Sequence, residues 1–278
     1  MFLIDFEYDG RMLSDFGFMI CNITTNSGVE TVSAGSNITW NTVTSNTTSK
    51  RRISSTQYDE VFSTTFEICK TLCDRSDNDT NYIQEQELRE ITMWLNRKKY
   101  LRFTPVFDDY EYSNIHYYGS FNIQFIKYGG RIIGLSLTLT TDAPFGYGEI
   151  EEYEFETTTS NNSFSIFDLS DEEGKLYLNA EIIPKQNGNL IIKNIYTNEN
   201  YTIINNCISG EIITLDGENK IITSDKQNNI HKRIYNDFNY KWLYISNVDS
   251  FEAENVFTTS LPCKIKITYE PIRKFGVV

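Results

Sequence analysis

Acidic side chains that could act as paired catalytic carboxylates lie in one short segment near the middle of the chain. Glu152, Glu154 and Glu156 alternate there with Tyr153 and Phe155. Two carboxyl groups at a suitable separation are the usual catalysts of glycoside hydrolysis. Alternate residues of a β-strand share a face, so the carboxylates lie together on one side and the rings on the other. We therefore predict an edge strand with a solvated, charged face, and keep a glycosidase as an alternative.

The two histidines show no arrangement for nucleophilic catalysis. His116 lies in a predicted strand and His231 in a polar loop. Neither has the local surroundings of a Ser-His-Asp or Cys-His site, so both are predicted to be structural or solvated. We assign no catalytic residue and predict that the protein is not an enzyme.

The cysteines and the acidic loop give no metal site. The five cysteines are odd in number and widely spaced, which argues against a disulfide framework and favours buried, reduced thiols. Cys69-x-x-x-Cys73 lacks a second Cys or His pair for zinc. A loop with three aspartates resembles part of a calcium loop, but its Gly and closing Glu are out of place. With no phosphate-binding Gly motif either, we predict no metal and no cofactor. The cysteines are Cys21, Cys69, Cys73, Cys207 and Cys263, and the aspartates are Asp74, Asp77 and Asp79.

Four aromatic residues lie two apart near the C-terminal end: Phe238, Tyr240, Trp242 and Tyr244. A strand would place all four rings on one face. That face is either the inner face of a β-sandwich or an aromatic platform that stacks on sugar. Leu243 and Ile245 in the same segment favour the core, and the platform stays open as an alternative.

One helix is predicted among the strands. Residues 81–98 have helical periodicity, with Ile83, Leu88, Ile91, Trp94 and Leu95 on one stripe. Asn81 is the predicted N-cap, with Gln84 as a capping-box residue. The basic run of residues 97–99 follows, where the helix dipole favours cations.

The rest of the chain has the composition and alternation of β-strands. Leu135, Leu137 and Leu139 share one face of a strand that follows the turn at Tyr128-Gly129-Gly130. Pro144 and two glycines then interrupt the pattern, and we place a domain boundary there. Residues 1–148 form the N-terminal domain, and residues 149–278 form a second domain with about eight to ten short strands, typical of a β-sandwich.

Residues 22–56 are rich in Asn, Thr, Ser and Gly, and Trp40 is their only large ring. The β-branched content favours an extended arm or long hairpin over disorder. Lys50-Arg51-Arg52 lies near its end, either as part of a solvated loop or docked on an acidic neighbouring subunit.

The overall composition bounds the function. The 278 residues are 40% hydrophobic and 14% aromatic, which indicates a folded protein with surfaces suited to assembly. The formal net charge of −13 argues against nucleic-acid binding, which depends on Lys and Arg. No apolar run approaches the length of a membrane span, and residues 1–5 lack the features of a signal peptide. We expect synthesis in the cytoplasm and no membrane insertion.

Four segments in order resemble the distal tail (Dit) proteins of long-tailed phages. They are Phe6-Glu7-Tyr8-Asp9-Gly10-Arg11 with Leu13-Ser14-Asp15-Phe16-Gly17-Phe18, then Trp94-Leu95-Asn96, the Tyr-rich hairpin at residues 110–125, and Ala143-Pro144-Phe145-Gly146-Tyr147. The resemblance covers about residues 1–148 and is weaker beyond. It implies a mainly β fold: a sandwich-like ring domain with one helix and an extended arm, and a galectin-like β-sandwich. The sugar-binding pattern of true galectins is absent.

The resemblance also implies a function. Six copies of a Dit protein form a ring that joins the tail tube to the baseplate hub at the tail tip of the virion. Expected partners are the tail tube protein, the tail-associated hub or lysin, and receptor-binding or peripheral baseplate proteins. Six chains of net charge −13 would carry about −78, which would repel DNA passing through the ring. The alternative is a carbohydrate-binding or receptor-recognition β-sandwich protein.

Overall fold

The structure is a computed structural model that describes residues 3–23, 37–44, 50–71, 82–108, 115–195, 201–226, 233–247 and 253–274. The chain divides into two compact units, which are treated separately below. Unit 1 consists of Met1–Gly148 and Arg273–Val278, and unit 2 of Glu149–Ile272. In the described part no helix is long and apolar enough to cross a membrane.

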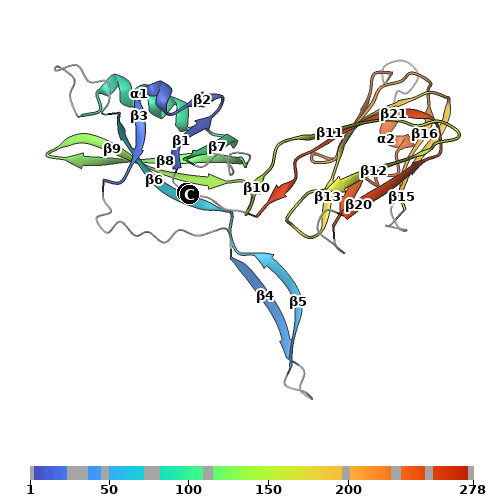
Figure 1. Cartoon of the computed structure of the whole chain (residues 1–278), viewed down its shortest axis with the longest axis horizontal. Helices are drawn as coiled ribbons and strands as arrows, with labels where there is room; N and C mark the ends of the chain where they lie inside the picture. Colours follow the sequence, from blue (N-terminus) through green and yellow to red (C-terminus); the bar gives the residue numbers. More distant parts are fainter. Residues whose placement is uncertain are drawn as a thin grey trace. The chain divides into compact units, whose positions relative to one another are not determined.

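Unit 1 is built on one antiparallel sheet of seven strands in the order β2-β1-β7-β8-β9-β6-β3 (Figure 1). Phe6 of β1 and Phe66 of β6 lie far apart in this order, yet their ring centroids are 5.5 Å apart. The sheet therefore curves and encloses its own core, as expected for a sandwich-like domain. Its elements are β1 (Leu3–Tyr8), β2 (Arg11–Met12), the 3-10 helix η1 (Ser14–Phe16), β3 (Phe18–Cys21), β6 (Ser63–Lys70), α1 (Glu85–Leu95), β7 (Leu101–Phe107), β8 (Tyr117–Tyr128) and β9 (Arg131–Thr141), with β4 (Ile38–Thr44) and β5 (Arg51–Tyr58) forming a separate hairpin and β10 (Gly146–Tyr147) pairing with β22 (Ile272–Arg273).

The turn between β8 and β9 explains their register. Tyr128 pairs with Arg131 across Gly129 and Gly130, which have φ values of 57° and 80°. A two-residue turn with both φ angles positive matches the twist of the strands, and glycine adopts it without strain. The alternation of β9 is confirmed, because its three leucines at 135, 137 and 139 are fully buried.

Helix α1 begins later than predicted. Gln84 is the N-cap, and its backbone N–H donates to the Glu87 carboxylate at 2.7 Å, so the capping box lies one turn beyond the predicted N-cap Asn81. Asn81 itself lies outside the described residues. The helix also ends before the basic run, at Leu95, but Arg97 Nε donates to the carbonyl oxygen of Trp94 at 3.2 Å.

The buried face of α1 closes the aromatic core of unit 1. Trp94 is stacked on Phe6, with centroids 5.7 Å apart, and its Nε1 donates to the carbonyl oxygen of Tyr8 at 2.8 Å. Phe6 also contacts Phe103 and Phe121. Burial raises the pKa of Tyr8 to about 12, consistent with its place in this core.

Unit 2 is a β-sandwich with one hydrophobic core. A five-stranded sheet has the order β11-β21-β14-β17-β18 and a four-stranded sheet the order β12-β20-β15-β16, and buried residues of both form a single cluster. The elements are β11 (Glu151–Glu156), β12 (Ser163–Asp168), β13 (Lys175–Tyr177), β14 (Asn179–Pro184), β15 (Gly188–Asn194), β16 (Tyr201–Cys207), β17 (Ile213–Asp216), β18 (Ile221–Ser224), α2 (Ile234–Asp237), β19 (Tyr244–Ser246), β20 (Ala253–Thr259) and β21 (Cys263–Tyr269).

The mainly β fold predicted from the sequence is therefore confirmed, and the sheets are antiparallel. The one α-helix predicted for the N-terminal domain is α1, whereas the one-turn helix α2 of unit 2 was not predicted. A helix of a single turn is too short to produce a helical period in the sequence.

Candidate assembly interface

The predicted arm is a two-stranded hairpin formed by β4 and β5, which we call the arm. It pairs Ile38 with Tyr58 at its base and Thr44 with Arg51 near its far end. The two strands pack mainly on each other and leave the seven-stranded sheet as a separate ribbon (Figure 1). The residues between 24 and 36, which the sequence also assigned to the arm, lie outside the described part.

A bulge at Ser54 sets which side chains share a face of the arm. Asn41 pairs with Ser55, whereas Thr42 pairs with Ile53, so Ser54 is an extra residue in β5. The Ser54 hydroxyl donates to the carbonyl oxygen of Asn41 at 2.9 Å and holds the bulge in place. Directly paired residues of antiparallel strands lie on the same face.

The two faces of the arm therefore differ in polarity. We call the first the apolar face. It carries Ile38, Trp40, Thr42, Thr44 from β4 and Arg51, Ile53, Thr56, Tyr58 from β5. The opposite, polar face carries Thr39, Asn41, Val43 from β4 and Arg52, Ser55, Gln57 from β5. Simple alternation back from Tyr58 would place Ile53 on the polar face; the bulge moves it to the face that also carries Trp40, where it pairs with Thr42.

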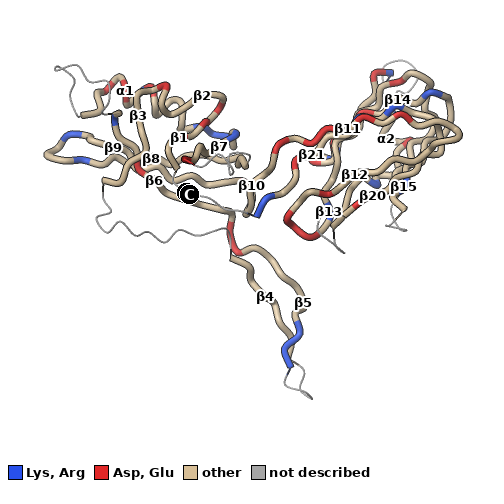
Figure 2. The backbone as a smooth tube through the Cα atoms, in the orientation of Figure 1, with Lys and Arg blue, Asp and Glu red and all other residues tan. Residues whose placement is uncertain are grey.

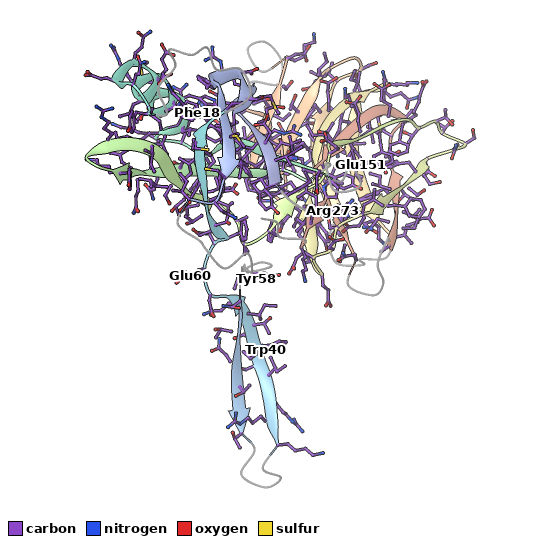
Figure 3. The ribbon with its side chains drawn as sticks, turned by 60° about the vertical axis from the view of Figure 1, so that its left-hand side comes forward. Phe18, Trp40, Tyr58, Glu60, Glu151 and Arg273 are labelled. Carbon is purple, nitrogen blue, oxygen red and sulfur yellow. The ribbon has the colours of Figure 1, made fainter. Side chains whose placement is uncertain are left out.

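Large apolar side chains of the arm are open to solvent. The exposed fractions are 57% for Trp40 and 57% for Ile53 on the apolar face, and 61% for Val43 on the other. Trp40 and Tyr58 are labelled in Figure 3, where the arm carries its side chains outward on both sides. Such exposure is unusual for a tryptophan, because each unit of the chain has a hydrophobic core in which large rings are buried.

The base of the arm is closed by hydrogen bonds and contacts another segment of unit 1. The Asp59 backbone N–H donates to the carbonyl oxygen of Asn37 at 2.9 Å, and the Thr39 hydroxyl is hydrogen-bonded to the Asp59 carboxylate. The ring of Tyr58 meets Phe145 edge-on at 6.4 Å. Phe145 belongs to the Pro- and Gly-containing segment that resembles Dit proteins, and this segment contacts the base of the arm.

Charge is distributed unevenly along the arm. Lys50, Arg51 and Arg52 lie at its far end, and the described arm residues between 37 and 58 include no Asp or Glu (Figure 2). Asp59 and Glu60 follow at the base. The arm is therefore a basic projection on a chain whose formal net charge is −13.

The candidate catalytic carboxylates form ion pairs instead. β11 is an edge strand, as predicted, and its glutamates are paired with lysines of β21 and with Lys185, which follows β14. Glu152 pairs with Lys266 at 2.8 Å, Glu154 with Lys264 at 3.2 Å, and Glu156 with Lys185. The bond from Lys185 lowers the pKa of Glu156, and the bond to Glu152 raises that of Lys266. The three ion pairs follow one another along the exposed face of this sheet.

The four aromatic residues do not form a platform. Phe238, Trp242 and Tyr244 are buried in unit 2, which matches the core interpretation. Tyr240 is 63% exposed because its φ of 57° turns the chain and breaks the alternation. The prediction that one strand carries all four rings is wrong, since β19 begins only at Tyr244.

The remaining candidates are structural or fall outside the described residues. His116 is fully buried, and its backbone forms a bridge with Tyr147. Cys207 and Cys263 are buried thiols, and Cys21 and Cys69 are partly buried thiols on neighbouring strands; none of the four forms a disulfide. His231, Cys73 and the aspartates at 74, 77 and 79 lie outside the described part. Elsewhere, no group of three or more His, Cys, Asp or Glu side chains could hold a metal ion.

The described residues form two antiparallel β units, one of which carries an exposed basic hairpin. The chain belongs to a phage tail protein family: residues 1–143 match its phage tail protein N-terminal domain and residues 145–269 match a phage tail C-terminal domain. It is a component of the phage tail and hence of the virion. No curated protein sequence matches the chain.

A solved structure of a phage tail protein has the same fold. The crystal structure of the Dit protein (gp 19.1) of phage SPP1 superposes with a TM-score of 0.63. The match covers 97% of this chain and 99% of that one at 13% sequence identity. The SPP1 protein is described as a paradigm of the hub adsorption apparatus of phages that infect Gram-positive bacteria. The chain thus has the Dit fold, as the resemblance in its sequence implied.

Proposed function

We propose that six copies of this chain form a ring that joins the tail tube to the baseplate hub. The observation that carries the proposal is the likeness to SPP1 Dit over 97% of the chain, which includes both units. A ring needs a heterologous contact repeated by rotation, and a projecting arm on each copy suits that geometry. The chain acts by binding and carries out no catalysis.

Residues 1–148 form the ring, and residues 149–278 form an outer, galectin-like docking domain. The tail tube protein binds one side of the ring and the tail-associated hub or lysin binds the other, while receptor-binding or peripheral baseplate proteins dock on the outer domain. The protein is made and assembled in the host cytoplasm and then resides at the tail tip. DNA passes through the ring without sequence-specific contact, because the acidic charge repels it.

Co-assembly with the neighbouring tail proteins of the same phage tests this function. The purified full-length chain is mixed with the tail tube protein, the hub protein, or both, and complexes are separated by size and examined by electron microscopy. We expect a three-part complex in which tube and hub occupy opposite sides of the ring. Binding of neither protein would contradict the proposal, as would competition of both for one side.

A further inference from the structure

Two cysteine thiols lie beside each other on neighbouring strands of unit 1. In the antiparallel pair of β3 and β6, Met19 lies opposite Cys69, and Cys21 is two residues further along β3. Residues two apart in a strand share a face, and so do directly paired residues, so both cysteines project from the same face of the sheet. Both are partly buried. A hydrogen bond between the two thiols, together with burial, raises the pKa of Cys21.

The sheet holds the two cysteines in this register from both directions. Before them along β3, Phe18 pairs with Lys70. Beyond the end of β3, the backbone N–H of Ile23 donates to the Glu67 carboxylate at 2.6 Å. On its other side β6 is paired with β9 over most of its length. The two sulfur atoms are therefore kept in contact by ordered strands, which is the condition for a bond between them.

We propose that Cys21 and Cys69 are a disulfide site: their thiols stay reduced while the chain is made and assembled, and they are joined after the particle leaves the host cell. The cytoplasm keeps thiols reduced, whereas the medium outside the cell is oxidising. The site itself depends only on the fold of unit 1. The timing rests on the proposed function, which places synthesis in the host cytoplasm.

Exchange with a small-molecule disulfide, such as oxidised glutathione, supplies the oxidation. The thiolate of one cysteine attacks a glutathione sulfur atom, which breaks the S–S bond, releases one glutathione and leaves a mixed disulfide. The other cysteine loses its proton, attacks the protein-bound sulfur and displaces the second glutathione. The chain thus loses two hydrogen atoms, and oxidised glutathione becomes two reduced molecules. The raised pKa of Cys21 keeps its thiol protonated at neutral pH, so the exchange is slow.

The bond joins the two strands between which the arm leaves the sheet. Cys21 lies on β3 before the arm, and Cys69 lies on β6 after it. β3 is an edge strand of the seven-stranded sheet, and β6 is its neighbour there (Figure 1). A cross-link at this place limits the separation of the two strands in the unfolded chain and thereby stabilises unit 1.

Peptide mapping without reduction tests the site. The full-length wild type and the Cys73→Ser variant are incubated with oxidised glutathione at mildly alkaline pH, digested and analysed by mass spectrometry. Cys73 lies outside the described residues, and its replacement removes a competing thiol close in sequence to Cys69. We expect one peptide pair that joins Cys21 to Cys69 in both proteins and is released by dithiothreitol. Cys207 and Cys263, buried in unit 2, should stay reduced.

Matched single replacements separate a specific pair from scattered oxidation. Cys21→Ser and Cys69→Ser, each made in the Cys73→Ser chain, should abolish the cross-link and leave at most one bound glutathione. Oxidation should raise the unfolding temperature of the Cys73→Ser chain by about 5–10 °C and should not raise that of the two serine variants. Glutathione adducts without a cross-link, a cross-link to another cysteine, or a bond that fails to raise the unfolding temperature would each overturn the inference.

Alkylation of thiols at harvest tests the timing. Chains taken from infected cells should be alkylated at both positions, whereas released particles should contain the bond between Cys21 and Cys69. Released particles that are alkylated at both positions would overturn the inference. Ring formation is measured separately by electron microscopy, so a chain that forms the bond and no rings supports this inference while contradicting the proposed function.

Discussion

Trp94 forms a hydrogen bond with Tyr8 that links helix α1 of unit 1 to its sheet. The indole nitrogen on α1 donates to the backbone carbonyl oxygen of Tyr8 on β1 at 2.8 Å, in a fully buried setting. The bond joins two of the segments by which the sequence resembles Dit proteins. It therefore gives a structural reason for their occurrence together in one chain.

The Trp94→Phe variant removes this donor while keeping an aromatic ring. We expect a loss of about 1–3 kcal/mol in the free energy of unfolding, because a buried acceptor loses a partner and the stack on Phe6 shrinks. Urea unfolding followed by circular dichroism measures it. Trp40→Phe, at an exposed position, is the control and should unfold as the wild type does. Equal midpoints for both variants would contradict this role for Trp94.

Gly217 is predicted to be essential in the turn between β17 and β18. A Cβ atom at this position would overlap the backbone carbonyl of Leu178, and its N–H donates to Asn179 Oδ1 at 2.9 Å. Gly217→Ala should therefore destabilise unit 2 by about 2 kcal/mol or more. Hydrogen exchange should accelerate in β14 and β17 and remain unchanged in β8 and β9. An unchanged exchange pattern in unit 2 would show that the turn tolerates the methyl group.

Asp168 is predicted to destabilise the folded state when it is ionised. It is 1% exposed, and burial raises its pKa. The folded protein holds this proton to higher pH than the unfolded chain, so the cost is present above the folded pKa and vanishes below the unfolded value of about 3.9. Asp168→Asn should raise the unfolding temperature at pH 8 and have little effect near pH 4.

Asp225 is the control for that experiment, because its pKa is shifted in the opposite direction. It accepts a hydrogen bond from the backbone N–H of Ile212 at 2.9 Å, and this bond lowers its pKa. Its charge stabilises the fold above the unfolded pKa and loses that effect as the pH falls through the lowered value. Asp225→Asn should therefore lower stability at pH 8. A loss of stability in both variants would contradict the argument for Asp168.

The basic end of the arm predicts salt-sensitive assembly. Arg51 lies on the apolar face, so Arg51→Glu should raise the concentration needed for ring formation and weaken its dependence on salt. Lys193→Glu, an equal change of charge on an exposed residue of unit 2, should have a smaller effect. Light scattering between low and high ionic strength measures both. Identical behaviour of the two variants would mean that only net charge matters.

The local signals of the sequence were sufficient for much of the fold. The leucines at 135, 137 and 139 and the turn at Gly129-Gly130 predicted a hairpin that the structure contains. The apolar stripe of α1 was also visible, because Ile91, Trp94 and Leu95 follow the helical period and are buried. Such signals depend on neighbours in sequence, and tertiary contacts reinforce them here.

The candidate interface could be predicted only in outline. The polar, β-branched composition indicated an arm, but nothing in Ser54 marks it as the site of a bulge, because that depends on the partner strand and on the bond to Asn41. Tyr240 is a similar case: its positive φ is held by the hydrogen bonds of Asn239 to β16, which alternation cannot reveal. Both features come from pairings between distant segments.

Electron microscopy of the purified full-length chain tests the central claim most directly. At high protein concentration we expect particles of about 194 kDa, six times the chain mass of 32.3 kDa, with six-fold symmetry and an open axis. Single chains at every concentration, or closed particles with no axial opening, would contradict the account.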